Sequence, residues 1–211
     1  MMVDRQIRPN DVTDRKILKA FMDVARQDFV SAAQRPLAYI DEDIPVTTEG
    51  DDRYLMEVTS MAKLIQLADI EPDNIVLDIG CATGYSTAIL SRLCNSVVAV
   101  ECDEHLAQRA GEALIDGNFD NAVVVQGPLE KGLPKEGPYD VIYIGGAVSE
   151  LPEGIADQLK EGGRLVVVEG IGNAGVARLY IRQGDKLSGR SAFNSAVKPL
   201  PGFEAKPQFV F

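Results

Sequence analysis

The sequence predicts an α/β protein with a doubly wound, mostly parallel sheet, helices on both faces and an antiparallel strand at one edge. Five short apolar runs between residues 75 and 169 alternate with segments of helical periodicity, as expected for parallel strands joined by covering helices. Beyond Glu169, two strand-like runs are joined by the turn GDKLSG, which is more typical of a hairpin than of a crossover.

The 211 residues and 45% hydrophobic content are sufficient for one substantial core. We find no internal repeat and no low-complexity linker, so we expect a single domain over residues 1–211. Its predicted parts are an N-terminal helical subregion (1–70), a central core (71–170) and a C-terminal hairpin and tail (171–211).

The expected elements follow the chain in order. Apolar residues at helical spacing predict helices over Thr13–Phe29, with Thr13 as its cap, and over Tyr54–Ala68. The expected parallel strands are Ile75–Ile79, Ser96–Glu101, Ala122–Gln126, Val141–Ile144 and Arg164–Glu169. The helices expected between them are Tyr85–Leu93, Glu104–Asp116 and Gly154–Leu159. The expected hairpin strands are Val176–Gln183 and Arg190–Val197.

Composition excludes several classes of partner. The net charge of −11 disfavours nucleic acid or an anionic membrane, because both require a basic surface. No apolar run is long enough to span a bilayer, and the N-terminus lacks a secretory apolar stretch. Three cysteines without metal-ligand spacing indicate reduced thiols in the cytoplasm and no bound metal.

The stretch IVLDIGCATGYSTAIL, residues 75–90, places a glycine-containing turn between a predicted strand and a predicted helix. Gly80 permits a sharp turn, and Gly84 permits close approach of a ligand at the helix start. Asp78 would repel a pyrophosphate but attract a cation. The loop therefore favours S-adenosylmethionine, which has an ammonium and a sulfonium group, over a dinucleotide.

Glu101 ends the next predicted strand, about twenty residues further on, where a carboxylate accepts hydrogen bonds from ribose hydroxyls in dinucleotide folds. Its placement favours an adenosine ligand, and the alternative is a solvated acid at a strand end.

The motif VLDIGCATGYSTAIL resembles the first motif of class I methyltransferases. The whole chain is similar to the protein-L-isoaspartate O-methyltransferase family through DRQIRPNDVTDRKILKAFMDVARQDFV, LAYIDEDIPV and PYDVIYIGGAVSELPEGIADQLKEGGRLVVV. This resemblance implies a seven-stranded sheet and a cytoplasmic repair enzyme that methylates the α-carboxyl of isoaspartyl residues in proteins or peptides. The cofactor-binding residues implied are Asp78, Gly80, Cys81, Ala82, Gly84, Tyr85, Glu101, Cys102, Gly127, Pro128, Leu129 and Gly145.

The chain departs from the family where the acceptor is received. Asp51, Asp52, Arg53, Tyr54 and Leu55 replace a Thr-Ile-Ser-Gln-Pro-like segment, and residues 41–52 contain six acids and no base. An anionic acceptor meets repulsion there unless the Arg53 side chain points inward as a bidentate clamp. The alternative for Arg53 is a solvated or salt-bridged side chain at the start of a helix.

A second departure follows the third parallel strand. Pro128 replaces an aspartate that in the family accepts a hydrogen bond from adenine, so that contact is lost or comes from elsewhere. After the fourth strand, the small residues Gly145, Gly146 and Ala147 resemble the family's run beside the methyl-transfer site and are expected to leave room for cofactor and acceptor.

Three alternatives remain open at this point. The same fold could methylate a different, neutral or cationic acceptor, or it could bind the cofactor without catalysis. A third alternative, an NAD-dependent oxidoreductase, is disfavoured by Asp78 and by the lack of a proton donor near the other strand ends.

Overall fold

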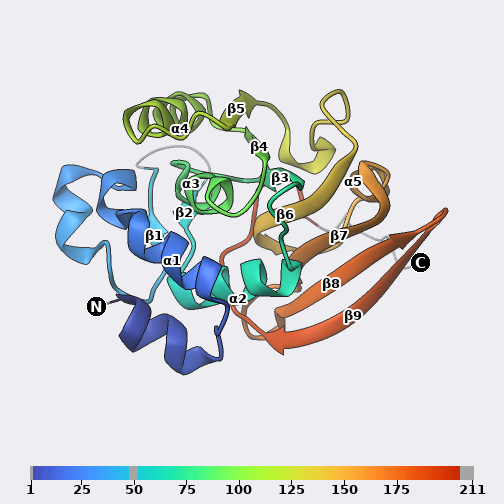
Figure 1. Ribbon diagram of the computed structural model, residues 1–211, viewed down its shortest axis with the longest axis horizontal. Helices are drawn as coiled ribbons and strands as arrows, with labels where there is room; N and C mark the ends of the chain where they lie inside the picture. The colour runs from blue at the N-terminus through green and yellow to red at the C-terminus, as the bar shows by residue number, and fades with distance from the viewer. Residues whose placement is uncertain (1, 48–51, 205–211) are drawn as a thin grey trace, which may run out of the picture.

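The computed structural model describes residues 2–47 and 52–204 (Figure 1). Its main feature is a seven-stranded sheet in the order β5-β4-β3-β6-β7-β8-β9. Strands β3 to β7 pair in parallel, whereas β8 pairs antiparallel with both of its neighbours. The strands are β3 (Ile75–Ile79), β4 (Ser96–Glu101), β5 (Ala122–Gln126), β6 (Tyr139–Val148), β7 (Leu159–Glu169), β8 (Val176–Gln183) and β9 (Lys186–Asn194). The predicted fold class is confirmed.

Strand order reverses between β3 and β6. The chain moves outward from β3 to β4 and β5, then returns to place β6 on the other side of β3. In open parallel sheets, ligands bind beyond the carboxyl ends of the strands at such a reversal. The turn after Ile79 and the small residues near the end of β6 therefore lie where a ligand site is expected.

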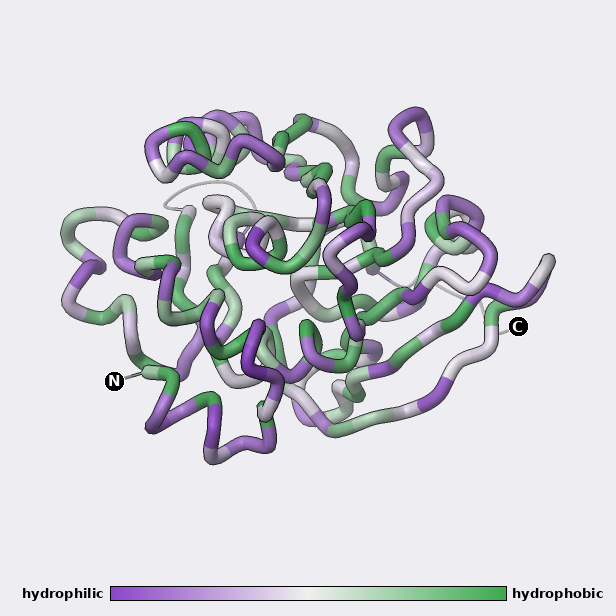
Figure 2. Tube along the Cα trace, in the orientation of Figure 1, coloured by the Kyte–Doolittle hydropathy of each residue, from purple (hydrophilic) through white to green (hydrophobic). Residues whose placement is uncertain are grey.

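Successive residues along a strand point to opposite faces of the sheet and join different hydrophobic clusters. Val76, Val141 and Val166 join the cluster formed with α1, α2 and α3, whereas Leu77 and Ile142 join a second cluster on the opposite face. The second cluster includes residues of α5 and of the segment after β9. The helices are α1 (Arg15–Asp23), α2 (Val58–Ala68), α3 (Tyr85–Ser91), α4 (Glu104–Asp116) and α5 (Glu153–Ala156). Figure 2 shows apolar residues concentrated along the central strands.

The first predicted helix is shorter than expected. Asp14, not Thr13, caps α1 by accepting from the N–H groups of Lys16 and Ile17. The helix ends at Asp23 because Val24 adopts extended backbone angles, and a short 3₁₀ turn, η3 (Arg26–Phe29), follows. The apolar residues of this segment are buried in either conformation, so their spacing did not locate the break.

The second helix, predicted from Tyr54, begins four residues later in the structure. Tyr54–Leu55 forms a short strand, β2, paired antiparallel with β1 (Ile44–Pro45), and α2 starts only at Val58. Pairing with β1 buries Leu55 without a helix. Strands β6 and β7 are longer than predicted, and β7 begins at Leu159, which had been assigned to the end of a helix.

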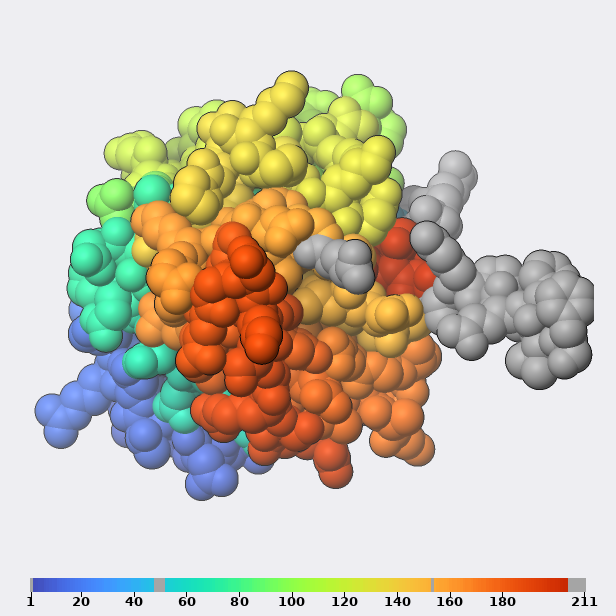
Figure 3. All heavy atoms as spheres, turned by 90° about the vertical axis from the view of Figure 1, so that its right-hand side faces the viewer, coloured from blue at the N-terminus to red at the C-terminus, as the bar shows by residue number. Residues whose placement is uncertain are grey.

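Strand β9 forms the far edge of the sheet, and most of its residues are exposed; Figure 3 shows this side of the molecule. Within residues 2–47 and 52–204, no helix combines the length and apolarity needed to cross a membrane.

Gly84 should be intolerant of any side chain. Its φ of +91° is unfavourable for other residues, and an added Cβ would lie 3.1 Å from Ala110 Cβ and 3.3 Å from Ala110 Cα in α4. We expect Gly84→Ala to lower the free energy of unfolding by about 2 kcal/mol, measured by urea denaturation.

Gly111→Ala in α4 is the matched control. Its added Cβ meets no atom of the described residues within 4 Å, so helix propensity should raise stability by up to about 1 kcal/mol. Equal effects of the two substitutions would contradict the packing described for Gly84.

Candidate functional site

Glu101, the last residue of β4, is fully buried at the carboxyl edge of the sheet. Oε1 accepts from the backbone N–H groups of Cys102 at 2.9 Å and Asp103 at 3.2 Å. Oε2 accepts from the backbone N–H of Ala82 at 2.7 Å, in the turn after β3. Glu101 therefore joins the turns that follow two adjacent strands, which rules out the alternative of a solvated acid at this strand end.

Arg53 completes the surroundings of this carboxylate. Its Nε lies 3.1 Å from Oε1 of Glu101 and its Nη2 lies 2.6 Å from Oε2, which makes a bidentate ion pair. The side chains are 2% and 0% exposed. Burial alone raises the pKa of Glu101, but the hydrogen bonds and charge of Arg53 outweigh burial and hold this pKa below its usual value.

A small hairpin holds the backbone of Arg53. The Arg53 N–H donates to Thr47 Oγ1 at 3.0 Å, and its carbonyl accepts from the N–H of Val46 at 2.8 Å, next to the β1–β2 pair. Arg53 thus precedes β2 instead of starting a helix, and its side chain is directed at Glu101. The predicted acceptor clamp is engaged in an internal ion pair; its role toward an acceptor remains a prediction. Asp51 lies outside the described residues.

Asp78, in β3, is fully buried and links the strand to α3. Its Oδ2 accepts from Ser86 Oγ and Thr87 Oγ1, each at 2.7 Å. Its Oδ1 has no hydrogen-bond partner among the described residues. Burial raises the pKa of Asp78 to about 6. The predicted attraction of a cation thus depends on a buried carboxylate that already has two hydroxyl partners.

The glycine turn has the sharp geometry that was predicted, with φ of +82° at Gly80. Ala82 also adopts a positive φ of +51°, which directs its N–H to Glu101. Gly84 was expected to let a ligand approach the helix start, but the structure brings Ala110 of α4 there instead. Gly84 therefore permits close packing of α3 against α4, and its contact with a ligand remains a prediction.

Leu200 lies over the small residues of the two strand ends. Its side chain is 2.8 Å from an ideal Cβ position on Gly80 and 2.6 Å from that on Gly146. At Gly145, an added Cβ would lie 3.0 Å from the carbonyl oxygen of Gly80. The glycines of β6 therefore permit contact with the Gly80 turn and with Leu200. The cavity beside Gly145 and Gly146 measures about 10 Å³, and its lining includes Arg53 and Leu200.

Several residues predicted to contact the cofactor are packed in the interior, and their contact with a cofactor remains a prediction. The ring of Tyr85 is fully buried against Phe21, Phe29 and the Arg26 guanidinium, so it does not face the turn. Cys81 is buried, and burial raises the pKa of its thiol well above the usual value. Cys102 does reach the site, since both its N–H and its thiol are directed at Glu101.

The segment after β5 lies beside the same edge. The N–H of Gly127 donates to the carbonyl of Glu101 at 3.0 Å, and the side chain of Leu129 is buried. The Pro128 carbonyl accepts from the N–H of Lys131 at 3.2 Å within a 3₁₀ turn. The structure therefore gives Pro128 a local partner, and recognition of an adenine by this segment remains a prediction.

Arg26 has a role that the sequence analysis did not identify, although its motif was noted as part of the family resemblance. Its side chain is fully buried and donates from Nη2 to the carbonyl of Met56 at 2.8 Å. The guanidinium also lies 4.9 Å from the centre of the Tyr85 ring. Arg26 thus holds the backbone just after β2, close to Arg53 in the sequence.

Two acids of the acidic segment are used by the fold. Asp43 Oδ1 accepts from the N–H of Glu57 at 2.9 Å, and Asp41 Oδ1 accepts from the N–H of Thr59 at 3.1 Å. These N–H groups lie at the start of α2, where carboxylates are favoured. The repulsive charge toward an acceptor is therefore smaller than the number of acids in the sequence indicates.

The residue types at this edge fit an adenosyl cofactor: a buried carboxylate at the end of β4, a tight glycine turn and a buried Asp78 with one unpaired oxygen. Their arrangement does not. The Glu101 carboxylate is fully engaged, and the adjacent cavity of about 10 Å³ compares with roughly 300 Å³ or more for a small-molecule site. In this conformation Arg53 occupies the Glu101 carboxylate at which a ribose is expected.

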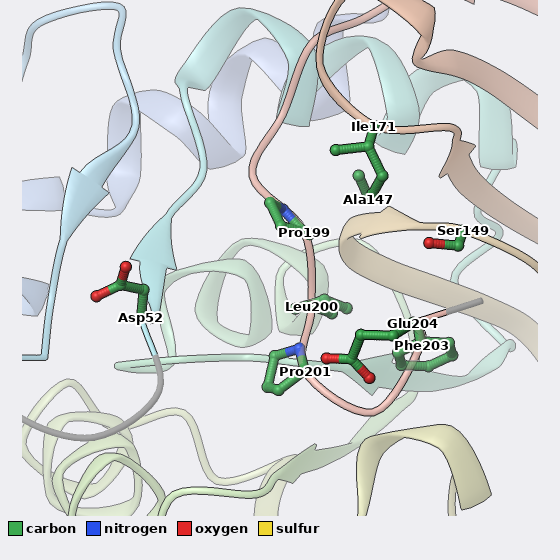
Figure 4. Close-up of a pocket in the computed structure, with 9 residues that line it drawn as sticks. All are labelled: Asp52, Ala147, Ser149, Ile171, Pro199, Leu200, Pro201, Phe203 and Glu204. Carbon is green, nitrogen blue, oxygen red and sulfur yellow. The ribbon is translucent and has the colours of Figure 1, made fainter. Parts of the chain in front are cut away.

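A larger cavity, of about 330 Å³, opens next to this site (Figure 4). Pro199 and Leu200 line both cavities, so the segment after β9 separates them. The other lining residues are Asp52, Ala147, Ser149, Ile171, Pro201, Phe203 and Glu204. This cavity combines an apolar wall with two carboxylates.

Asp78 should make stability depend on pH. Its pKa is about 6 in the folded chain against an unfolded value of 3.8, so unfolding releases a proton between these values and stability falls as pH rises through this window. The shift corresponds to about 3 kcal/mol. Asp78→Asn removes this dependence, so between about pH 4 and pH 7 it should gain about that much stability relative to the wild type. A pH-independent difference in urea denaturation would contradict the buried state of Asp78.

Comparison with known proteins shows the family. The sequence model for protein-L-isoaspartate(D-aspartate) O-methyltransferase matches residues 1–199. The Koribacter versatilis protein-L-isoaspartate O-methyltransferase is 30% identical over 95% of this chain and 89% of its own length. The enzyme of that name from Roseiflexus castenholzii is 32% identical over 97% and 92%.

Solved structures agree. A protein-L-isoaspartate O-methyltransferase structure matches with a TM-score of 0.81 and 27% identity, over 90% of this chain and 62% of that longer chain. A Plasmodium falciparum protein assigned to the same enzymes and solved with S-adenosyl-L-homocysteine has a TM-score of 0.78 at 18% identity, over 93% and 95%, and supports the fold alone.

The predicted enzyme class, a methyltransferase that uses S-adenosylmethionine, is confirmed by these matches. The chain belongs to the protein-L-isoaspartate(D-aspartate) O-methyltransferase family.

Proposed function

We propose that this chain transfers a methyl group from S-adenosylmethionine to the carboxyl group of isoaspartyl residues in proteins or peptides. The observation that supports this most strongly is the family match, which extends over residues 1–199 and therefore includes the N-terminal region as well as the sheet. Curated relatives with this activity in their names are matched over 89–92% of their length.

The reaction requires little proton chemistry from the protein. A carboxyl acceptor has a reference pKa near 3.9 and is already an anion at neutral pH, so no general base is needed. The cofactor, when bound, supplies the electrophilic methyl group. The protein's task is to hold the acceptor oxygen in line with it. A site made of a carboxylate, an arginine and backbone N–H groups is compatible with that task.

The cavity of about 330 Å³ beside Leu200 is the proposed entry for the acceptor. Pro199 and Leu200 separate it from the smaller cavity that Arg53 lines. Arg53 remains a proposed clamp for the acceptor carboxylate once its side chain is free. Asp52 and Glu204 line the larger cavity and disfavour an anionic segment. We therefore expect acceptor peptides with basic residues near the isoaspartyl site to be preferred.

We further propose that the substrate is protein and not nucleic acid, because the chain carries a net charge of −11. A cytoplasmic location is proposed from the three free cysteines of the chain, Cys81, Cys94 and Cys102.

Methyl transfer to a synthetic peptide tests this function. An isoaspartyl peptide with lysines on both sides, incubated with methyl-labelled S-adenosylmethionine, should acquire a base-labile methyl ester. The same peptide with ordinary aspartate is the control and should remain unlabelled.

We expect turnover far below that of the Koribacter versatilis relative, because a buried ion pair must open and because Asp52 and Glu204 oppose an anionic acceptor. Label in neither peptide would contradict the proposed substrate. Turnover equal to that of the relative would show that the changed loop does not limit the reaction.

A further inference from the structure

The Arg53–Glu101 ion pair uses the hydrogen-bonding capacity of the Glu101 carboxylate completely. A carboxylate has about four lone-pair directions. Glu101 accepts from three backbone N–H groups, those of Ala82, Cys102 and Asp103, from two N–H groups of Arg53, and from the Cys102 thiol at 3.3 Å. No acceptor position is left for a further ligand while Arg53 stays paired.

The two donors of Arg53 correspond in number to the two hydroxyls of a ribose. The three backbone donors are fixed by the turns after β3 and β4, so they cannot be released without unfolding those turns. Of the N–H donors, only those of the Arg53 side chain can leave by rotation about side-chain bonds. After their departure three backbone N–H partners remain, two on Oε1 and one on Oε2, so at least one of about four lone-pair directions, on Oε2, is open to a ribose hydroxyl.

The space around the ion pair agrees with this. An ideal Cβ on Gly80 would lie 3.3 Å from Arg53 Nη2, so the guanidinium covers the glycine turn as well as Glu101. The cavity lined by Arg53, Gly145 and Gly146 measures about 10 Å³. A cofactor can enter only when the guanidinium moves away.

The backbone around Arg53 is held from both sides, so opening of the ion pair falls to the side chain. The Arg53 backbone is bound to Val46 and to Thr47 Oγ1, and Arg26 binds the carbonyl of Met56. The hairpin can therefore remain in place while the guanidinium leaves Glu101.

We propose that Arg53 competes with the ribose of the cofactor for Glu101, so that the ion pair must open before S-adenosylmethionine or S-adenosylhomocysteine binds. This inference rests on the proposed function, because it requires an adenosyl cofactor at the end of β4. The apparent dissociation constant is the intrinsic one divided by the fraction of molecules with the pair open. A fraction below about one tenth weakens binding at least about tenfold.

Calorimetric titration of the full chain with S-adenosylhomocysteine tests the competition. Arg53→Met removes the guanidinium and keeps side-chain length, and it should tighten binding at least about tenfold. Glu101→Gln removes the charge that both partners share, and it should weaken binding. If the ion pair only stabilised the site, both variants would bind S-adenosylhomocysteine more weakly. Tighter binding by Arg53→Met and weaker binding by Glu101→Gln would therefore show competition.

Arg190→Met is the matched control, because Arg190 is exposed on β9; it should bind as the wild type does. Should Arg53→Met fail to fold, Arg53→Lys keeps the charge without the bidentate geometry and should still tighten binding several-fold.

The outcomes separate this inference from the proposed function. Binding by the wild type that is equal to or tighter than that of the folded Arg53 variants would overturn the competition and leave the cofactor assignment intact. Absence of heat with every variant at millimolar ligand would overturn the cofactor assignment, and the competition with it.

Discussion

One buried carboxylate, Glu101, determines the arrangement of the whole ligand edge. It binds the turn after β3 through Ala82, the turn after β4 through Cys102 and Asp103, and the β1–β2 hairpin through Arg53. An unpaired buried charge costs several kcal/mol, and together these contacts keep the carboxylate ionised in the interior. The same requirement makes Glu101 a ready receptor for any ligand that supplies hydrogen-bond donors.

The hairpin that carries Arg53 connects the N-terminal region to this edge. The side chains of Arg26, Asp41 and Asp43 hold the backbone between residues 55 and 59. This region precedes β3, the first strand of the seven-stranded sheet. The hairpin also borders the larger cavity through Asp52, whereas Arg53 lines the smaller one. Two consecutive residues of this hairpin therefore face the two neighbouring cavities.

Sequence patterns predicted the parallel strands and the placement of Glu101 because both depend on local order: apolar runs of strand length, and an acid where the run ends. β3, β4, β5 and β8 have the predicted bounds. The break after Asp23 was missed because the apolar spacing continues beyond it. The strand at Tyr54–Leu55 was missed because its pairing with β1, which places Leu55 opposite Ile44, joins residues distant in the sequence. The role of Gly84 was assigned to a ligand because sequence does not show that Ala110 packs there.

The Arg53–Glu101 contact could not be predicted either, since 48 residues separate the partners. The sequence singled out both residues as candidates for the site, one at the acceptor and one at the cofactor, and these roles remain predictions. Only the fold shows that the two side chains bind each other, so that the donors of Arg53 and the acceptor oxygens of Glu101 are already used. A chemically suitable residue is therefore insufficient evidence for an open site; its existing partners decide whether a ligand can reach it.

The most direct measurement is a crystal structure of the wild-type chain with S-adenosylhomocysteine. The account predicts ribose hydroxyls within hydrogen-bond distance of Glu101 and the Arg53 guanidinium withdrawn from it. A ribose bound at Glu101 with the bidentate pair intact, or a ligand bound away from β4, would contradict the account.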